Sequence, residues 1–357
     1  MSYYILPKNY DTINVNPQYS DESISPYLSL SLLNYYNKIE NQINLMFQHA
    51  DLSDNTFDEA IKLINPYEFI FSSVPGSKFS VSKLKHKTNL FYDLLEIYNN
   101  LNIFEEYNSC DINSLHISSN NDDSIECFGM IREKFNDKIM FYNSDENIVD
   151  DLTDEIKFDF IFYEINTKNY FLSIMKLLLL IIKNQSYNGT TVFKISDSFH
   201  KISIETLYLL SSLYKTVHVC KPNTNNITTF DKYIVCKNFI ISNDTKDNYL
   251  RFNYLKLLVF IKKINNKNIS RILDFDVPYY FKNKIDDINI IIGQQQIDAL
   301  DQIIFIYKNK SKDDKIEIIK KNNIHKSVVW CEKHKIPCNK FTEKTNIFLP
   351  IINSQSV

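Results

Sequence analysis

The stretch from residue 169 to residue 239, in which apolar helices and apolar strands alternate, decides the fold. Its parts read, in order, NYFLSIMKLLLLIIKNQ (169–185), TTVFKI (190–195), SIETLYLLSSLY (203–214), VHVC (217–220) and DKYIVCKNF (231–239). The first and third parts carry apolar residues at helical spacing, and the other three are short runs typical of buried strands. Because only a loop separates the last two strands, they are predicted to form an antiparallel pair at one edge of a sheet.

The same alternation begins further upstream. FYDLLEIYNNLNIF (91–104) and SIECFGMIREKF (124–135) predict helices, whereas NSLHIS (113–118), KIMFYN (138–143) and FDFIFYEI (158–165) predict strands. Strands that alternate with helices form a mostly parallel sheet covered on both faces. The sequence therefore predicts the α/β class and a Rossmann-like sheet, mostly parallel with one antiparallel edge strand.

Three regions are expected along the chain. Residues 1–87 are interpreted as an irregular arm and a helical segment, residues 88–244 as the sheet domain, and residues 245–357 as a helical extension. In the first region a helical pattern runs from Ser25, a second covers residues 57–64, and EFIFSSV (68–74) is strand-like. In the last region IDDINIIIGQQQIDALDQIIFIY (285–307) has the spacing of a long amphipathic helix.

Composition narrows the setting. The chain has 357 residues, of which 44% are hydrophobic, so a sizeable core can be buried. The longest apolar run, residues 171–182, is too short for a bilayer, which needs roughly 20 residues. The first residues carry no basic segment followed by an apolar one, and the six cysteines are scattered. We therefore expect a cytoplasmic protein with reduced cysteines and no membrane association.

Glycine is scarce. The chain contains only Gly76, Gly129, Gly189 and Gly293, whereas roughly 7% of residues in an average protein are glycine. Glycine lets a backbone approach a ligand closely and adopt positive φ. A cofactor loop that needs several glycines therefore has almost nothing from which to be built.

The segment 171–239 resembles the second half of the FtsJ/RrmJ-type ribose 2'-O-methyltransferases, and most of all their extended forms in large cytoplasmic DNA viruses. The similarity continues through IGQQQIDAL (292–300) and VVWCEKHKIPCNKF (328–341). Those enzymes transfer a methyl group from S-adenosylmethionine to a ribose 2'-hydroxyl, commonly on an mRNA cap. The resemblance implies a Lys-Asp-Lys-Glu tetrad and a glycine-rich cofactor loop.

The resemblance places the tetrad at Asp93, Glu164, Lys194 and Asp231. Lys194 is unchanged, the two acids differ in length, and the first lysine is replaced by Asp93 in the frame Tyr-Asp-Leu-Leu-Glu-Ile. A carboxylate there opposes the negative charge that develops on the reacting oxygen. With three carboxylates around it, Lys194 is expected to stay protonated rather than to act as a base.

The resemblance places the cofactor loop at Ser119, Asn120, Asn121, Asp122 and Asp123, where the family has Gly-Pro-Gly-Gly-Phe. These residues can form a turn, but they offer no bare backbone, and they put two carboxylates where the carboxylate of the ligand would lie. We expect this loop to be non-functional, with no cofactor bound, and Asp122 or Asp123 to cap the following helix.

Several alternatives stay open. The loop VPGSKFS (74–80) resembles a Pro-Gly-x-Phe motif and would leave an active methyltransferase that uses S-adenosylmethionine. An RNA-binding module would use Lys194, Lys221 and the segment 308–344, which has eleven lysines against five acidic residues. A zinc set is also conceivable, but packing in the core is the preferred interpretation and no metal is expected; its residues are His325, Cys331, His334 and Cys338.

The preferred hypothesis is a methyltransferase homologue that no longer catalyses and is used for its surface. By its resemblance to viral proteins, it would be a structural or regulatory partner in an RNA-capping or virion assembly. Another protein subunit is the expected partner, RNA is a further one, and the expected location is the cytoplasm, a virus factory or the virion.

Overall fold

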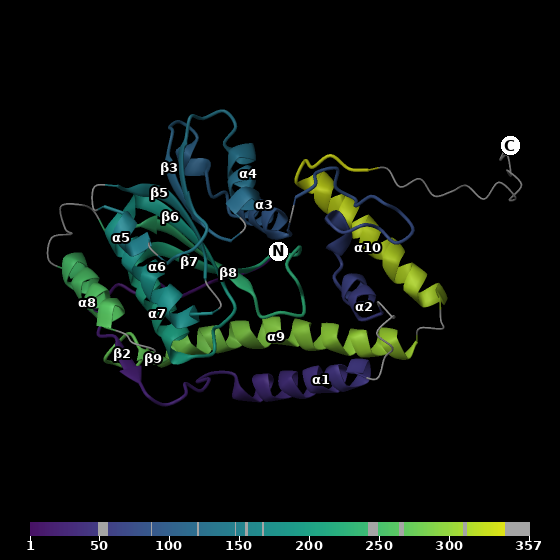
Figure 1. Cartoon of the computed structure of the whole chain (residues 1–357), viewed down its shortest axis with the longest axis horizontal. Coiled ribbons are helices and arrows are strands. Elements are labelled where there is room, and N and C mark those ends of the chain that lie inside the picture. The colour runs from purple at the N-terminus through teal and green to yellow at the C-terminus, as the bar shows by residue number, and fades with distance from the viewer. Residues whose placement is uncertain are drawn as a thin grey trace, which may run out of the picture.

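A computed structural model shows how these elements are arranged (Figure 1). The structure describes residues 1–48, 56–86, 88–119, 121–146, 148–153, 156–165, 168–241, 249–263, 268–309 and 313–339. Within them, a sheet domain continues into an arm of helices, and the two lie side by side along the long axis of the molecule.

The main sheet has seven strands in the order β1-β7-β8-β6-β5-β3-β4. Their bounds are β1 Ser2–Ile5, β3 Asn113–Ile117, β4 Lys138–Tyr142, β5 Phe158–Glu164, β6 Gln185–Ile195, β7 Tyr214–Lys221 and β8 Lys232–Phe239. A separate two-stranded sheet pairs β2 (Gln18–Ser20) with β9 (Asn268–Arg271).

Strands β4, β3, β5 and β6 are parallel neighbours, and β8 runs antiparallel to both β6 and β7. The predicted antiparallel pair therefore exists, but β8 lies inside the sheet, between β6 and β7. The edge beyond β7 is occupied by β1, whose residue Tyr3 pairs antiparallel with Cys220. The beginning of the expected irregular arm is thus a strand. A mostly parallel sheet with an antiparallel end is a Rossmann-like α/β fold.

Ten helices are described, together with two short 3-10 turns. Their bounds are α1 Leu30–Gln48, α2 Thr56–Ile64, α3 Leu90–Asn100, α4 Asn121–Ile131, α5 Ile148–Asp151, α6 Tyr170–Asn184, α7 Lys201–Leu213, α8 Tyr249–Lys263, α9 Tyr279–Lys308 and α10 Asp313–Lys333; the 3-10 turns are η1 Glu68–Ile70 and η2 Glu105–Tyr107.

Alternate residues of each strand belong to two separate cores, as the period of two requires. Ile161 and Tyr163 of β5 join the core that includes α6 and α7. Phe160 and Phe162 of the same strand join the core that includes α3 and α4. Helix α6 is almost wholly buried because its apolar residues cover nearly its whole circumference.

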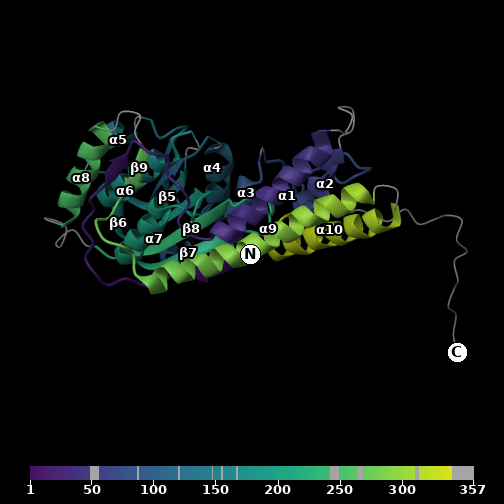
Figure 2. The ribbon, with the colours of Figure 1, turned by 90° about the horizontal axis from the view of Figure 1, so that it is seen from below.

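The arm of helices consists of α1, α2, α9 and α10. Its long helix α9 runs alongside α1 (Figure 2). At Gly293 the two helices approach so closely that an added Cβ would lie 2.4 Å from Cδ2 of Leu32. Pro278 lies directly before α9 and marks the start of this helix, because proline is disfavoured inside a helix. The helix predicted over residues 285–307 is therefore present and longer than its apolar pattern.

Two local expectations were wrong. The strand expected at residues 68–74 is instead the 3-10 turn η1, in which Ile70 N–H donates to the carbonyl of Tyr67. The sequence pattern of a short buried apolar run is the same for a strand and for a helical turn. Helix α4 begins at Asn121, so Asp122 and Asp123 lie inside its first turn, where their charges favour the positive helix end without being cap residues. Among the described residues, no helix has the length and apolarity required for crossing a bilayer.

Candidate functional site

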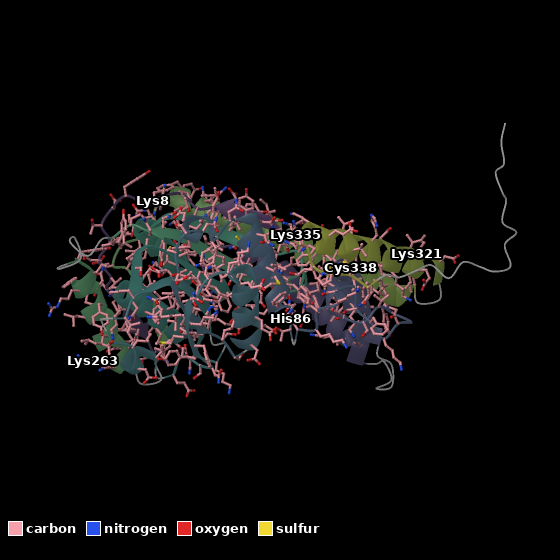
Figure 3. All side chains as sticks on the ribbon, turned by 90° about the horizontal axis from the view of Figure 1, so that it is seen from above. Lys8, His86, Lys263, Lys321, Lys335 and Cys338 are labelled. Carbon is pink, nitrogen blue, oxygen red and sulfur yellow. The ribbon has the colours of Figure 1, made fainter. Side chains whose placement is uncertain are left out.

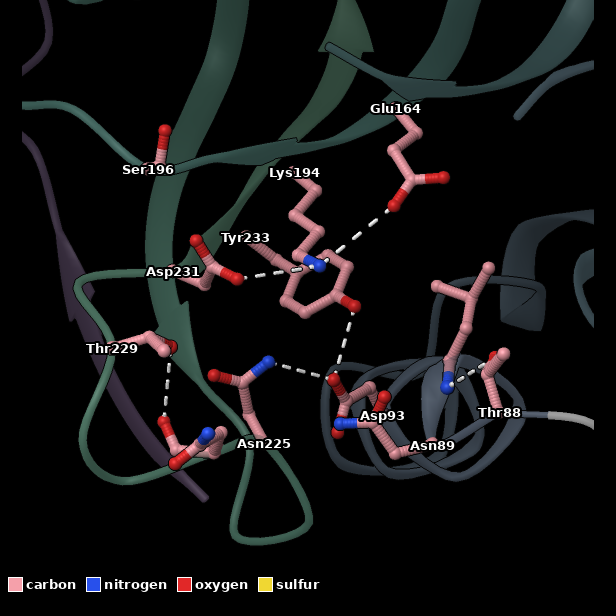
Figure 4. A network of polar contacts seen from close by, with 12 residues as sticks. Thr88, Asn89, Asp93, Glu164, Lys194, Ser196, Asn225, Thr229, Asp231 and Tyr233 are labelled. Atoms are coloured by element: carbon pink, nitrogen blue, oxygen red, sulfur yellow. Dashed lines mark hydrogen bonds and ion pairs between the residues drawn. The ribbon is translucent and has the colours of Figure 1, made fainter. Parts of the chain in front are cut away.

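Three side chains form a row across the carboxyl ends of neighbouring strands. Glu164 of β5 is in register with Lys194 of β6, and Lys194 is in register with Tyr233 of β8. Paired residues point to the same face of a sheet. The row therefore faces the side covered by α3, and Asp231 lies just before β8 (Figure 4).

Lys194 lies between two carboxylates. Its Nζ is 3.4 Å from Oδ2 of Asp231 and 3.7 Å from Oε1 of Glu164. Burial alone would lower the pKa of Lys194, but Asp231, Glu164 and Asp93 together outweigh burial, and the pKa is raised. The ammonium form is therefore stabilised, whereas a lysine that serves as a base needs a lowered pKa. The expectation that Lys194 stays protonated agrees with this direction.

Asp93, which the resemblance assigns to the first tetrad lysine, is buried, and its carboxylate is hydrogen-bonded. Its carboxylate accepts hydrogen bonds from Oγ1 of Thr224 at 2.5 Å, Nδ2 of Asn225 at 2.8 Å and the Tyr233 hydroxyl at 3.0 Å. Burial raises the pKa of Asp93 to about 6, and these hydrogen bonds together with Lys194 oppose the rise. A buried carboxylate with three donors is a structural anchor, and it ties α3 to the loop that follows β7 (Figure 4).

The loop between β7 and β8 is shaped by Lys221. Its buried Nζ donates to Oδ1 of Asn225 at 2.7 Å and to three backbone carbonyls, those of Asn226, Thr229 and Asp231, at 2.9, 2.9 and 2.7 Å. Burial lowers the pKa of Lys221 to about 7. Because Lys221 is buried inside the loop, it is a structural lysine rather than a surface contact for RNA.

The predicted cofactor loop is very short. Only residues 118–120 separate β3 from α4, and Asn120 lies outside the described residues. In α/β sheets a ligand binds where the strand order reverses, and here that place is between β3 and β5. The Ser118 hydroxyl bridges this point by donating to Oε2 of Glu164 at 2.7 Å, and Ser119 lies 3.5 Å from the same oxygen.

The two alternative sites have no such geometry. The loop VPGSKFS follows the 3-10 turn η1 rather than a strand, so the strand–loop–helix unit of a nucleotide site is missing there. At the suggested zinc set, Trp330 and Cys331 are buried in the core, and Nδ1 of His334 contacts Asn99 at 3.1 Å. Among the described residues, the only three ligand atoms that converge belong to a different cluster, His86, Asp123 and Glu126.

The structure thus brings all four predicted tetrad positions together, and it adds partners that the sequence did not indicate. Tyr233 and Asn225 are donors to Asp93, and Ser118 is a donor to Glu164. Tyr233 is a buried strand residue by its period, so its hydroxyl gave no separate signal. The contact between Thr224 and Asp93 was not predicted from the sequence either.

Comparison with known proteins points to one enzyme class. No family model matches the sequence. The cap-specific mRNA (nucleoside-2'-O-)-methyltransferase 1 of Leishmania braziliensis is 25% identical over 129 residues, which are 35% of this chain and 31% of that protein. The protein of the same name from Dictyostelium discoideum is 27% identical over 129 residues, 35% of this chain and 16% of its own length. The chain thus matches less than a third of either relative.

Two solved methyltransferase structures show weaker similarity to this chain. A ribosomal RNA methyltransferase from Plasmodium falciparum is 15% identical with a TM-score of 0.33, covering 43% of this chain and 99% of its own. Human methyltransferase-like protein 13 is 9% identical with a TM-score of 0.27, covering 54% and 95%. At these values the strand order, not the similarity, identifies the fold. Homologues of part of this Rossmann-like chain are therefore the cap-specific mRNA 2'-O-methyltransferases.

Proposed function

We propose that this protein is an FtsJ-like homologue of the cap 2'-O-methyltransferases that neither binds S-adenosylmethionine nor transfers a methyl group. It acts instead as a structural or regulatory subunit in a viral RNA-capping or virion assembly. The observation that carries the proposal is that Asp93, which the resemblance assigns to the first catalytic lysine, has a buried carboxylate that accepts hydrogen bonds from three donors.

The charge balance of the site supports this proposal. A methyl acceptor hydroxyl loses its proton during transfer, so the site must stabilise negative charge on that oxygen. Here three carboxylates (Asp93, Glu164 and Asp231) lie around the ammonium of Lys194, whose pKa they raise. An additional anionic oxygen would be repelled by the carboxylates, and Lys194 is a poor acceptor for its proton.

The cofactor side of the site supports the same conclusion. The Ser118–Glu164 hydrogen bond spans the strand-order reversal where the nucleoside of a bound ligand would lie. The turn of three residues before α4 contains no glycine and leads directly into Asp122 and Asp123. The carboxylate of S-adenosylmethionine would meet like charge at this helix end.

Titration with S-adenosylmethionine tests the proposal directly. A ligand present at a hundred times its Kd adds about 2.7 kcal/mol to the free energy of unfolding, which raises the Tm of a chain of this size by a few degrees. We expect no shift in Tm and no heat of binding in calorimetry. A saturable shift, or methyl transfer to capped RNA by the purified chain, would contradict the proposal and favour an active methyltransferase.

The partner role is supported by the outer edge of the sheet. Among the described residues, β4 has a neighbouring strand on one side only, and its Ile139 and Phe141 side chains are 39% and 57% exposed. Open apolar edges invite the addition of another strand. We expect a complex with a co-expressed capping or capsid subunit to survive gel filtration, and to be lost in Phe141→Lys; an unchanged complex would place the contact elsewhere.

An RNA-binding role is the second candidate, and the surface of α10 favours it. Lysines 315, 321, 326 and 333 on this helix are exposed, and so is Lys335 beyond its end (Figure 3). Such a helix would bind phosphate with an affinity that falls steeply with salt. Fluorescence anisotropy with capped RNA at several salt concentrations would detect this. Loss of binding in a Lys321→Glu, Lys326→Glu double variant would support it, and loss in Lys194→Ala would place RNA in the former groove.

A further inference from the structure

The segment between η1 and α3 carries a histidine that is held rigidly against the sheet domain. The His86 side chain is 10% exposed, and its ring stacks on Phe91 with a centroid distance of 3.5 Å and an interplanar angle of 11°. Tyr92 contacts the same ring edge-on at 5.6 Å. Figure 3 labels His86 near the junction of the sheet domain and the arm.

Two carboxylates of α4 face this histidine. Asp123 and Glu126 are three residues apart on the helix, so both lie on one face. The candidate ligand atoms of His86, Asp123 and Glu126 all lie within 4.8 Å of one another. Asp123 is buried, and its Oδ2 accepts from the backbone N–H of Thr88 at 2.8 Å and from the Thr88 hydroxyl. Its carboxylate is therefore fixed in orientation.

Hydrogen bonding within the described residues does not satisfy the imidazole. Both ring nitrogens of His86 are buried without a well-aligned hydrogen-bond partner there, although Nδ1 lies only 2.9 Å from Oε2 of Glu126. A buried polar group left in this way destabilises the fold unless a further partner binds it. Two ligand atoms at about 2.1 Å from one ion lie about 3.0 Å apart at an angle of about 90°, and about 3.4 Å apart at the tetrahedral angle. The 2.9 Å between the nitrogen and the oxygen thus suits neighbouring ligands about 90° apart in one coordination sphere.

We propose that His86, Asp123 and Glu126 bind a divalent transition-metal ion, such as zinc. One imidazole with two carboxylates suits this class, whereas magnesium and calcium prefer oxygen ligands throughout. Glu126 is 60% exposed, which leaves a face open to water as a further ligand. The bound ion joins the segment before α3 to the first turns of α4, next to the site where a methyltransferase would hold its cofactor.

The experiment uses the full chain, freed of metal with a chelator and titrated with zinc chloride in a calorimeter. We expect one ion per chain and a rise in Tm that saturates with it. Glu126→Gln keeps the shape of an exposed side chain and should weaken binding at least about tenfold. Glu133→Gln changes another exposed glutamate, just beyond α4, and should bind as the parent chain does.

Cobalt(II) distinguishes this site from the cysteines near the end of α10. Ligation by nitrogen and oxygen alone gives only weak visible bands, whereas thiolate ligands add an intense near-ultraviolet charge-transfer band. The proposal is overturned if the parent chain binds no zinc. It is also overturned if Glu126→Gln binds as tightly as the parent, or if cobalt shows the thiolate band that Cys331 and Cys338 would produce.

Discussion

The two halves of the main sheet differ in how far the side chains of their strands are exposed to solvent. In the half from β5 to β8, most strand residues are buried, and Phe160 and Phe162 are 0% exposed. In the other half, β4 pairs with only one strand among the described residues and leaves Phe141 57% exposed. The buried half also carries Glu164 at the end of β5 and Lys194 near the end of β6.

The contacts of the predicted tetrad residues join these parts of the fold. Asp93, Glu164, Lys194 and Asp231 meet, and their contacts hold α3, the loop after β7 and the turn after β3 together. The four predicted tetrad positions are thus connections between elements. The predictions below test this division of the molecule, from the largest expected effect to the smallest.

The largest contrast should come from one substitution made in each half. Phe162→Ala empties a site in the buried half and should lower the free energy of unfolding by about 3–5 kcal/mol. Phe141→Ala removes the same atoms from the exposed strand β4 and should change it by no more than about 0.5 kcal/mol. Urea unfolding followed by circular dichroism measures both; equal losses would mean that β4 is as well packed as β5.

Lys221→Met should be the next most damaging change. It leaves one side-chain oxygen and three carbonyls without their donor, and it should cost about 3 kcal/mol because hydrogen bonds to a buried charge are strong. Lys215→Met, at an exposed position of the same strand, is the control and should be nearly neutral. Comparable Tm values for the two variants would show that the loop after β7 does not need its lysine.

Asp93 should make stability depend on pH. Its folded pKa of about 6 lies above the ordinary value of 3.8 because the carboxyl is buried. The native state therefore holds this proton more tightly than the unfolded chain. The resulting stability is complete below pH 3.8 and is lost as the pH rises through about 6.

The matching variant is Asp93→Asn, which cannot titrate at this position. Relative to it, the free energy of unfolding of the parent chain should fall by on the order of 2–3 kcal/mol between pH 4 and pH 7. Chemical denaturation at several pH values measures the difference. A difference that stays constant with pH, or grows, would show that Asp93 titrates at or below its ordinary pKa.

The smallest predicted effect concerns the turn after β3. Ser118→Ala removes the 2.7 Å hydrogen bond to Glu164 and should cost about 1–2 kcal/mol. Ser119→Ala removes only a 3.5 Å contact made by an exposed side chain and should cost almost nothing. If the two variants unfold at the same urea concentration, the Ser118 bridge contributes nothing to holding the turn.

The sequence predicted the elements whose pattern is long or strongly periodic, such as α6, α9 and strand β6. It missed β1, because four residues before a proline carry too little pattern to indicate a strand. It also placed β8 at the edge, since a hairpin rule gives pairing but not the position of the pair within a sheet. In both cases the deciding partners are far away in the sequence.

The candidate site was predicted only as far as the resemblance reached. Asp93, Glu164, Lys194 and Asp231 were placed in advance, and the structure brings them together. The donors to Asp93 were not foreseen, because they come from β8 and from the loop after β7, which are far from α3 in the sequence. His86 gave no signal for the same reason, since its two candidate co-ligands lie on α4.

The pairing of β1 with β7 has a consequence for how the chain folds. Tyr3 pairs with Cys220, so this strand pair closes a loop that spans more than half of the chain. Contacts between such distant residues form slowly. We expect the β1–β7 pair to form late in refolding, and amide protons of β7 that face β1 to gain protection after those that face β8.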